Sequence, residues 1–314
     1  MINHLSFLHK SILFLLTILL WNCSSSIEEV NTEGFLEING SPVFYKAIGS
    51  GPPIIVIHGG PLLNHSYMIS HFEQLAKDYT LIFYDQRLCG QSSIEVDLKT
   101  FRLDGFVQDI ELLRKALDLE HISILGHSWG GFLAMKYAIA FPDNLDALIL
   151  SNSMPGNYKH WRQEEEVIAK RNSPEDSLKR QEIISTPFTM GAKAITSLIL
   201  LSYKNLFYNP LLVDSLQLNL TDDYMDRSKI FNRLGPEINN YDLYSDLKNV
   251  NTPTLVIYGD TEPAASISAP LLVATIPNSE LVVLKDCGHF PFIEQPQNYF
   301  QKIKEFLSFQ VPIK

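Results

Sequence analysis

A serine flanked by glycines, between a strand-like run and a helix-like run, constrains this sequence more than any other feature. His121–Leu125 predicts a short buried strand, and Gly131–Phe141 predicts an apolar helix. The residues between them, GHSWG at 126–130, fit the pattern G-x-S-x-G. In this context the turn lifts the serine hydroxyl out at the carboxyl edge of a sheet. Ser128 is therefore a candidate nucleophile, and an ordinary tight turn is the alternative.

Strand-like and helix-like runs alternate along most of the chain. Two alternating runs flank Asn39-Gly40, which is a strong signal for a β-hairpin. The expected strands are 34–39, 42–48, 54–58, 80–85, 121–125, 145–150, 254–258 and 280–284, and the expected helices are 67–77, 101–119, 131–141, 267–276 and 297–309. This order predicts a doubly wound, mostly parallel α/β sheet that opens with an antiparallel hairpin.

The alternation is interrupted between residues 153 and 246. This segment is polar and helix-like, has no clear strand, and carries charge clusters such as RQEEE at 162–166. The interruption indicates an inserted helical module, which would lie over the carboxyl edge of the sheet, where sites on such sheets form. The expected division is a core of 34–152 and 247–314 with a helical cap of 153–246.

The first 23 residues are expected to be a targeting segment outside the fold. Residues 11–21 form an apolar run of signal-peptide length, too short for a comfortable membrane span. The run ends close to Cys23, which serines follow, and this pattern looks like a bacterial lipoprotein processing site. Cys23 would then be lipidated, 24–33 would be a polar tether, and the protein would be exported and anchored to a bacterial membrane. Cleaved secretion and an uncleaved anchor are the alternatives.

Composition narrows the classes of partner. The chain has 25 Lys and Arg against 35 Asp and Glu, and no basic patch stands out, which argues against nucleic-acid binding. The sequence has no cluster with metal-ligand spacing and no phosphate-cradling loop, so neither a metal nor a cofactor is expected. Besides Cys23 the chain has Cys89 and Cys287, and both are expected to be free thiols near the site.

A serine nucleophile needs a base to take its proton and a carboxylate to orient that base. His289 follows the expected strand 280–284 in a glycine-containing loop and is the candidate base. Asp260 and Glu262 follow the expected strand 254–258, so the sequence offers two candidate acids. The order serine, acid, histidine along the chain is that of the α/β-hydrolases.

The tetrahedral oxyanion of such a reaction needs two N–H donors. Trp129, the residue after the serine, offers one of them. The glycines of HGGP at 58–61 let the backbone approach a substrate, so Gly60 offers the second. An ordinary loop is the alternative reading of HGGP taken alone.

Three motifs together resemble the proline iminopeptidases of the α/β-hydrolase fold. HGGP at 58–61 is similar to the family's HGGPG, DQRLCGQS at 85–92 to its DQRGCGxS, and GHSWGG at 126–131 to its GHSWGG. DCGH at 286–289 is similar to the segment that carries the family's catalytic histidine. The resemblance implies an α/β-hydrolase fold with a mostly parallel eight-stranded sheet and a helical cap. It also implies a serine hydrolase acting through an acyl-enzyme, an aminopeptidase that releases N-terminal proline or a small apolar residue.

Under this resemblance Ser128 would be the nucleophile and His289 the base. The family's acid stands in a G-x-x-D pattern, and the corresponding residue here is Glu262, with Asp260 as the alternative. The expected substrate is a small peptide or an ester.

The resemblance also implies roles around the triad. Gly60 and Trp129 would form the oxyanion hole, while Asp85 and Arg87 would hold loops together through charge-assisted hydrogen bonds. The family binds the free amine of its substrate with glutamates, and a segment RLGPE resembles the cap segment that carries one of them. Glu237, its last residue, is therefore a candidate substrate-binding residue, and a solvated cap residue is the alternative.

The chain departs from the family pattern at three positions. Leu62 and Leu88 stand where the family has glycines, and both are expected to narrow or reshape the pocket. Pro263 follows Glu262 where the family has a second acid, so half of the expected amine clamp is missing. The alternatives are a carboxylesterase of the same fold and a non-catalytic surface binding protein.

Overall fold

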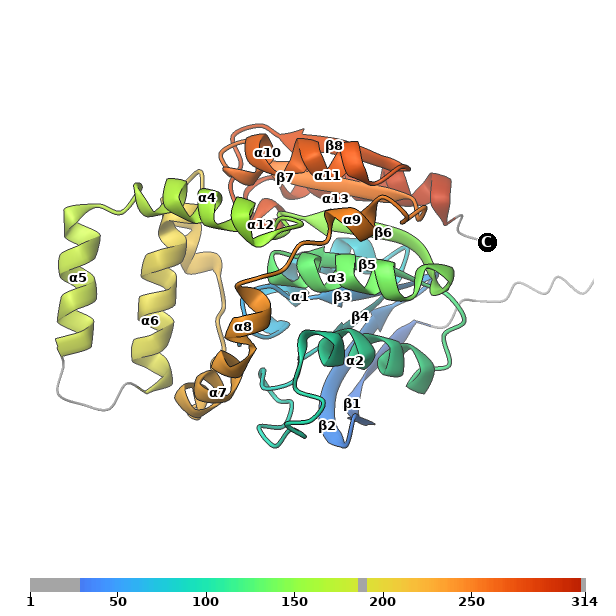
Figure 1. The fold of residues 1–314 in the computed structure, drawn as a ribbon, viewed down its shortest axis with the longest axis horizontal. Coiled ribbons are helices and arrows are strands. Elements are labelled where there is room, and N and C mark those ends of the chain that lie inside the picture. The colour runs from blue at the N-terminus through green and yellow to red at the C-terminus, as the bar shows by residue number, and fades with distance from the viewer. Residues whose placement is uncertain (1–28, 186–190, 312–314) are drawn as a thin grey trace, which may run out of the picture.

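One β-sheet carries the fold in the computed structural model, which describes residues 29–185 and 191–311 (Figure 1). Within these ranges eight strands lie in the order β1-β2-β4-β3-β5-β6-β7-β8. β1 pairs antiparallel with β2 and β2 antiparallel with β4, whereas every later pair is parallel. The strands are β1 (Val30–Ile38), β2 (Ser41–Gly49), β3 (Pro53–Ile57), β4 (Thr80–Tyr84), β5 (Ile122–His127), β6 (Leu145–Ser151), β7 (Thr254–Gly259) and β8 (Ser279–Leu284). The predicted mostly parallel sheet with its opening hairpin is confirmed.

The hairpin between β1 and β2 differs from the prediction at its start. Asn39 and Gly40 have φ of 51° and 73°, the two positive values that a type I′ turn requires. However, β1 begins at Val30, so the last residues of the expected tether 24–33 are part of the sheet. Residues 31–33 are exposed on this edge strand, and a strand with both faces in water does not show apolar alternation.

The central strands are buried on both faces, and helices cover each face of the sheet. Four of the five residues of β3 and all six residues of β5 are buried. Helices α2, α3 and α11 pack on one face and helices α1, α12 and α13 on the other. These helices are α1 (Ser66–Ala76), α2 (Leu103–Ala116), α3 (Trp129–Ala140), α11 (Ala269–Thr275), α12 (Pro291–Glu294) and α13 (Pro296–Gln310), and α10 (Ala264–Ile267) precedes α11. The loops after β3, β5, β7 and β8 therefore meet at one edge, as parallel strands require.

The segment between β6 and β7 is helical, as expected for a cap. Its two ends are joined by an antiparallel bridge between Asn157 and Asp242. Its helices are α4 (Tyr158–Ala169), α5 (Pro174–Ser185), α6 (Ala192–Tyr203), α7 (Tyr224–Phe231), α8 (Gly235–Ile238) and α9 (Tyr244–Leu247), with short 3-10 turns at Lys204–Leu206, Pro210–Ser215 and Asn232–Leu234. Figure 1 shows α5 and α6 side by side, extending away from the sheet at the left of the view. The cap is thus anchored at one end and reaches outward at the other.

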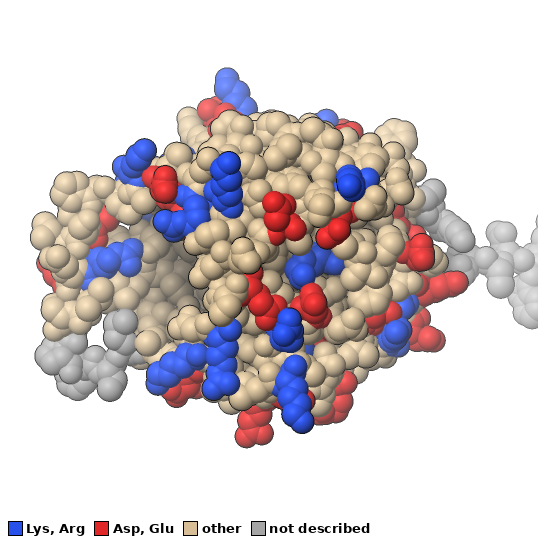
Figure 2. Space-filling model, viewed as in Figure 1, with Lys and Arg blue, Asp and Glu red and all other residues tan. Residues whose placement is uncertain are grey.

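The surface offers no large field of one sign on the face that Figure 2 shows, because acidic and basic side chains are interspersed there. No helix in the described part of the chain is long and apolar enough to cross a membrane. The predicted targeting segment 1–23 and the lipidated Cys23 lie outside the described residues.

Candidate active site

The candidate nucleophile lies on a strained turn between β5 and α3. Ser128 has φ 55° and ψ −119°, a conformation that L-residues rarely adopt. The two glycines of the motif are needed because a Cβ on Gly126 would lie 2.4 Å from the carbonyl oxygen of Gly130, and a Cβ on Gly130 would lie 2.2 Å from that of Ile57. The turn leaves Ser128 half-buried and lining a cavity.

Both predicted oxyanion donors border the same cavity as Ser128. Gly60 lines it with φ 57°, a left-handed conformation that suits glycine. Trp129 is the first residue of α3, so its N–H is among those that a helix leaves without an intrahelical partner. These two backbone groups and the start of α3 are placed to stabilise negative charge beside Ser128.

His289 and Glu262 face each other at the rim of the cavity. His289 Nδ1 lies 3.1 Å from Glu262 Oε1, and Glu262 is only 6% exposed. The two atoms are within ion-pair distance but are not aligned as a hydrogen bond, and such contacts often tighten only when substrate is bound. Asp260, the alternative acid, is exposed, and its carboxylate accepts a hydrogen bond from the N–H of Cys287 at 3.1 Å. The geometry therefore pairs His289 with Glu262.

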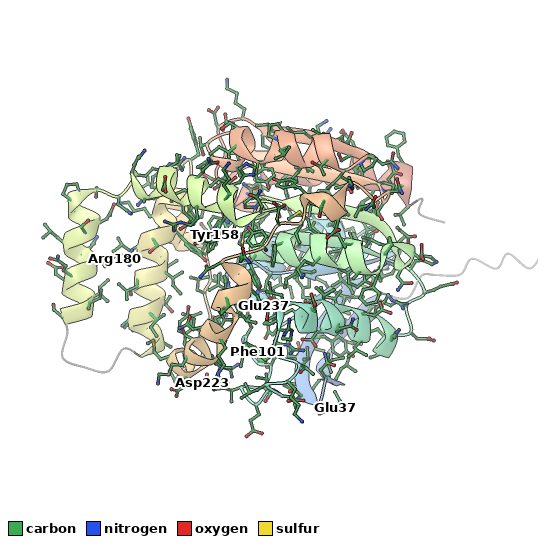
Figure 3. All side chains as sticks on the ribbon, in the orientation of Figure 1. Glu37, Phe101, Tyr158, Arg180, Asp223 and Glu237 are labelled. Atoms are coloured by element: carbon green, nitrogen blue, oxygen red, sulfur yellow. The ribbon has the colours of Figure 1, made fainter. Side chains whose placement is uncertain are left out.

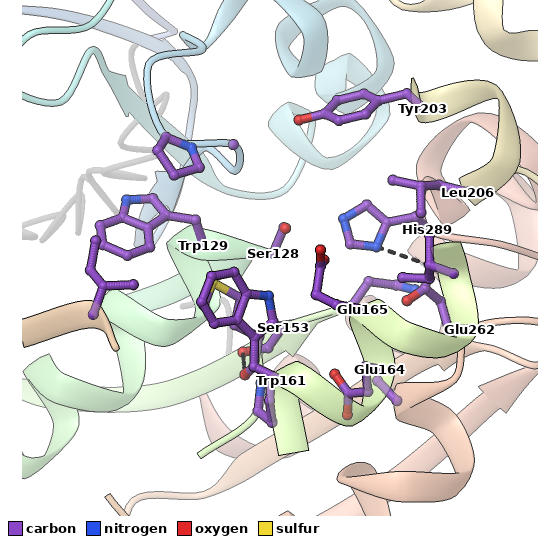
Figure 4. A pocket seen from close by; sticks show the side chains of 18 of the residues that line it. Ser128, Trp129, Ser153, Trp161, Glu164, Glu165, Tyr203, Leu206, Glu262 and His289 are labelled. Atoms are coloured by element: carbon purple, nitrogen blue, oxygen red, sulfur yellow. Dashed lines mark hydrogen bonds and ion pairs between the residues drawn. The ribbon is translucent and has the colours of Figure 1, made fainter. Parts of the chain in front are cut away.

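The cavity has a volume of about 290 Å³ and lies between the core loops and the cap (Figure 4). In Figure 4 the Ser128 hydroxyl and the His289 ring point toward the same space. The walls are mostly apolar, and the cap and the loops around it contribute Met154, Trp161, Ile168, Leu206, Phe231 and Ile238. A small apolar group next to a reacting carbonyl fits such a space.

Two cap carboxyls in this cavity were not predicted from the sequence. Glu164 and Glu165 on α4 both line it, and the carboxyl group of Glu165 points toward Ser128 and His289 in Figure 4. Burial raises the pKa of Glu164 to about 8, and the nearby carboxylates add to the shift. Trp161, Glu164, Glu165 and Ile168 have the i, i+3, i+4, i+7 spacing of one helix face. That spacing, which runs from Trp161 through the RQEEE cluster to Ile168, is the sequence signal that could have identified the two glutamates.

Glu237, the predicted amine-binding residue, lies outside the cavity. Figure 3 labels it on α8, and its carboxylate accepts a hydrogen bond from the N–H of Leu103 at 3.1 Å. Leu103 is the first residue of α2, where the helix leaves N–H groups free and favours negative charge. The neighbouring residue, Ile238, lines the cavity instead. The structure therefore places the Glu237 carboxylate at the start of α2, and the same short helix reaches the cavity through Ile238.

Leu62 and Leu88 do not reshape the cavity as predicted. Both are buried in the hydrophobic core, and neither is among the residues that line the site. Their φ values are 69° and 66°, so both keep the left-handed backbone that a glycine would take. The leucine side chains therefore contribute core contacts and do not enter the cavity.

The predicted roles of Asp85 and Arg87 agree with their hydrogen bonds. Asp85 accepts from the N–H and Nδ1 of His65 at 3.1 and 2.7 Å and from the N–H of Gln91 at 2.8 Å. Arg87 forms a buried ion pair with Asp109 and also donates to backbone carbonyl oxygens. Both side chains hold loops next to the site. Cys89 and Cys287 are free, as expected, and both are buried.

Gln86 joins the two sides of the oxyanion site. Its Oε1 accepts a hydrogen bond from the indole Nε1 of Trp129 at 2.9 Å, and its Nε2 donates to the carbonyl oxygen of His58 at 2.8 Å. The indole can only donate and the carbonyl can only accept, so the orientation of the amide is fixed. Gln86 therefore ties the loop that carries Gly60 to the start of α3.

A serine held on a strained strand-to-helix turn, with a histidine supplied from the end of the same sheet, is the arrangement of a serine hydrolase. The family model described as the alpha/beta hydrolase fold matches residues 52–296. The chain belongs to this family and, within it, to the proline iminopeptidases.

Relatives that match in sequence agree with this membership, and solved structures agree with the fold. The chain is 31% identical to the proline iminopeptidase of Heyndrickxia coagulans, over 88% of this chain and 99% of that protein. It is 27% identical to the proline iminopeptidase of Saccharolobus solfataricus, over 88% of this chain and 92% of that protein. The crystal structure of proline iminopeptidase from Mycobacterium smegmatis aligns with a TM-score of 0.67 at 20% identity, covering 89% and 98% of the two chains. An esterase from Exiguobacterium antarcticum aligns with a TM-score of 0.66 at 18% identity, covering 88% and 99%, and both structures show the shared fold.

Proposed function

We propose that this serine hydrolase is an aminopeptidase that releases N-terminal proline or a small apolar residue from peptides. The observation that carries the proposal is an apolar cavity that two cap carboxyls line, one of which, Glu165, points toward Ser128. An N-terminal residue brings a small side chain, a scissile carbonyl and a free ammonium group into one site. A buried ammonium needs carboxylate partners, and relatives named proline iminopeptidase share most of the chain.

In the proposed mechanism Ser128 Oγ attacks the carbonyl carbon while His289 takes its proton. The oxyanion of the tetrahedral intermediate accepts hydrogen bonds from the N–H groups of Gly60 and Trp129. His289 then gives the proton to the leaving amine, and the acyl-enzyme forms. In the second half water attacks the acyl carbonyl with His289 again as base; the bond to Ser128 Oγ then breaks, His289 returns the proton to that oxygen, and the released amino acid leaves. Glu262 orients the imidazole and balances its positive charge, because its Oε1 lies 3.1 Å from Nδ1.

Substrate recognition is proposed to fall to Glu165, with Glu164 beside it. Both lie on the face of α4 that closes the cavity, whereas Glu237 is engaged with the start of α2. Because the pKa of Glu164 is raised to about 8, its side chain is mostly neutral at pH 7 and offers a hydrogen-bond acceptor. The carboxylate of Glu165 would supply the charge that an ammonium group requires.

The test compares proline and alanine arylamides with their N-acetylated forms and with short-chain nitrophenyl esters. We expect turnover of the free-amine amides and at least a tenfold loss of kcat/KM on N-acetylation. Glu165→Gln should raise KM for the free-amine substrates and leave the nitrophenyl esters unaffected. Glu166→Gln is the matched control, because Glu166 is the next residue of α4 but does not line the cavity. Turnover of esters with none of amides would reject the aminopeptidase.

A carboxylesterase is the second candidate for a specific reason. Pro263 fills the position after Glu262 where the family pattern has a second acid, and esterase structures share the fold. A fluorophosphonate label addresses the remaining alternative, a non-catalytic surface binding protein. Labelling of Ser128 in the wild type supports a hydrolase, and a chain that does not label would support the binding protein.

The location of the protein is a separate proposal that rests on the sequence alone. An apolar run ending near Cys23, followed by serines, supports an exported protein held at a bacterial membrane by a lipid on that cysteine. Metabolic labelling with a fatty acid, in bacterial cells that express the full-length chain, should mark the protein, and Cys23→Ser should abolish the label. A labelled Cys23→Ser protein or an unlabelled wild type would contradict this location.

A further inference from the structure

A buried chain of hydrogen bonds links the three loops that supply the catalytic groups. The N–H of Gly59 donates to the Tyr67 hydroxyl at 2.7 Å, and that hydroxyl lies 2.8 Å from His127 Nδ1. His127 Nε2 lies 2.9 Å from the backbone carbonyl oxygen of His289. None of Gly59, Tyr67 and His127 lines the cavity, so these contacts are not with substrate.

Backbone groups at both ends fix the direction of every hydrogen bond in this chain. The N–H of Gly59 can only donate, so the Tyr67 oxygen accepts from it and donates its own hydrogen to His127 Nδ1. The carbonyl of His289 can only accept, so His127 Nε2 carries the proton. His127 is therefore a neutral imidazole in its Nε2–H form, and a second proton on Nδ1 would leave the tyrosine hydrogen without an acceptor.

Each of the three loops that these hydrogen bonds connect also carries a group of the active site. In each loop that group belongs to the hydrogen-bonded residue itself or to the residue that follows it. Gly59 precedes the oxyanion donor Gly60, His127 precedes the nucleophile Ser128, and His289 itself is the base. We propose that Tyr67 and His127 are positioning residues that fix the separation of oxyanion site, nucleophile and base through this chain of hydrogen bonds. The inference rests on the proposed function, since it concerns the placement of that triad and oxyanion site.

Aromatic rings pack around His127 and bury it from solvent. Its ring centroid lies 5.9 Å from that of Tyr67, 5.5 Å from that of Phe290 and 5.2 Å from that of Phe292. Its side chain is buried, and burial lowers its pKa well below the usual range for histidine, in agreement with a neutral ring.

The loop at Gly59 is packed against the turn that carries Ser128, and Tyr67 links the two through hydrogen bonds. A Cβ on Gly59 would lie 2.8 Å from the Cβ of Ser128 and 2.9 Å from Nδ1 of His127. The loop therefore cannot move inward, and the Tyr67 hydroxyl keeps it from moving outward. Losing that hydroxyl frees the loop in one direction only, away from the site where the oxyanion forms.

The first test compares Tyr67→Phe with Tyr84→Phe. Both remove a buried tyrosine hydroxyl, but that of Tyr84 has no hydrogen-bond partner among the described residues. We expect Tyr67→Phe to lower kcat about 10- to 100-fold with KM changed less than about threefold, because misplaced groups slow the chemical step more than binding. Tyr84→Phe should leave both constants near wild type. Equal kinetics for the two variants, or a change confined to KM, would overturn the inference.

Two further measurements separate this inference from the proposed function. The wild type must turn over substrate and react with a fluorophosphonate at Ser128, and a wild type that does neither would reject the function itself. In ¹⁵N-histidine NMR, the resonances lost in His127→Gln identify His127. They should show the neutral Nε2–H form, and Tyr67→Phe should shift its Nδ1 resonance, whereas Tyr84→Phe should not. An Nδ1–H form or a charged ring at pH 7 would overturn the inference even in an active enzyme.

Discussion

The core loops and the cap line the same cavity, but the polar groups that support the core loops from behind are held differently from the carboxyl groups of the cap. In the core, Gln86 uses both ends of its amide, and Asp85 accepts three hydrogen bonds from its neighbours. In the cap, Glu164 Oε1 is buried with no hydrogen-bond partner in the described residues, and Glu165 points into the cavity.

This contrast suggests how the work is divided. Reacting atoms must be fixed in advance, because small displacements cost rate. Groups that recognise a substrate gain from being left with an unused hydrogen-bonding capacity, which the ligand then satisfies. Changes in the core should therefore act on kcat and changes in the cap on KM, and the following experiments examine that division.

The largest effect is expected at the nucleophile. Ser128→Ala removes the atom that forms the acyl-enzyme, so kcat should fall by about 10⁴ to 10⁶. Ser153→Ala is the matched control, since Ser153 lines the same cavity but its hydroxyl donates to the carbonyl oxygen of Met154 at 2.7 Å. Steady-state kinetics on the preferred arylamide measures both. A Ser128→Ala protein that retained more than a few per cent of wild-type turnover would mean that the core does not supply the chemistry.

The next effect separates the two candidate acids. Glu262→Gln leaves the shape of the side chain but no longer balances the imidazolium, and kcat should fall about 10³- to 10⁴-fold. Asp260→Asn should cost less than about tenfold, because the Asp260 carboxylate contacts the N–H of Cys287 instead of His289. The opposite ranking in kcat would make Asp260 the acid.

A smaller kinetic effect is expected at Gln86. Gln86→Met keeps the length of the side chain but removes both hydrogen bonds, so the Gly60 loop and Trp129 lose a common tether. We expect kcat to fall about 10- to 100-fold with little change in KM. Gln91→Met is the control, since its side chain is exposed in the same loop. A rise in KM at constant kcat would mean that Gln86 acts on substrate binding. It would contradict the division of kcat and KM effects between core and cap.

Glu164 offers a test of the cap through stability. Its folded-state pKa is about 8 against an ordinary value of 4.5, so the folded protein binds more protons than the unfolded chain between these values. The stability that this group contributes is present below pH 4.5 and is lost as pH rises toward 8, by up to a few kcal/mol. The melting temperature of Glu164→Gln should therefore equal that of the wild type at pH 4. Its advantage over the wild type should then grow as the pH rises to 9. A constant difference across this range would show that folding does not raise the pKa of Glu164.

The sequence contained most of the chemistry because that chemistry is local. The turn at Ser128 depends on small residues at fixed spacing around it, and His289 lies in the loop that follows the end of β8. The partner of a cap carboxylate is not a local property, so the motif that pointed to Glu237 could not tell that its carboxylate binds the start of α2. Likewise, the edge-strand residues before Phe35 carry no apolar alternation, and only pairing with β2 makes them a strand.

The two leucines at family glycine positions show the same limit from another direction. From the sequence, a leucine in place of glycine predicts a change in the shape of the pocket. In the structure, however, Leu62 and Leu88 keep positive φ and bury their side chains. Packing in the core offsets the backbone strain, and only the structure shows that the side chain leaves the cavity. The strain itself can be measured.

The smallest expected effect is that strain at Leu88. Leu88 has φ 66° and is fully buried, so Leu88→Ala loses core contacts and keeps the strained backbone, while Leu88→Gly loses nearly the same contacts and relieves the strain. The free energy of unfolding of Leu88→Gly should therefore be about 1 kcal/mol larger than that of Leu88→Ala, the reverse of the usual order in regular structure. Chemical denaturation of the two variants measures the difference, with Leu133→Ala and Leu133→Gly in α3 as the pair that should follow the usual order. If alanine were the more stable residue at both positions, the left-handed turn at Leu88 would carry no strain, and its core packing alone would explain the leucine.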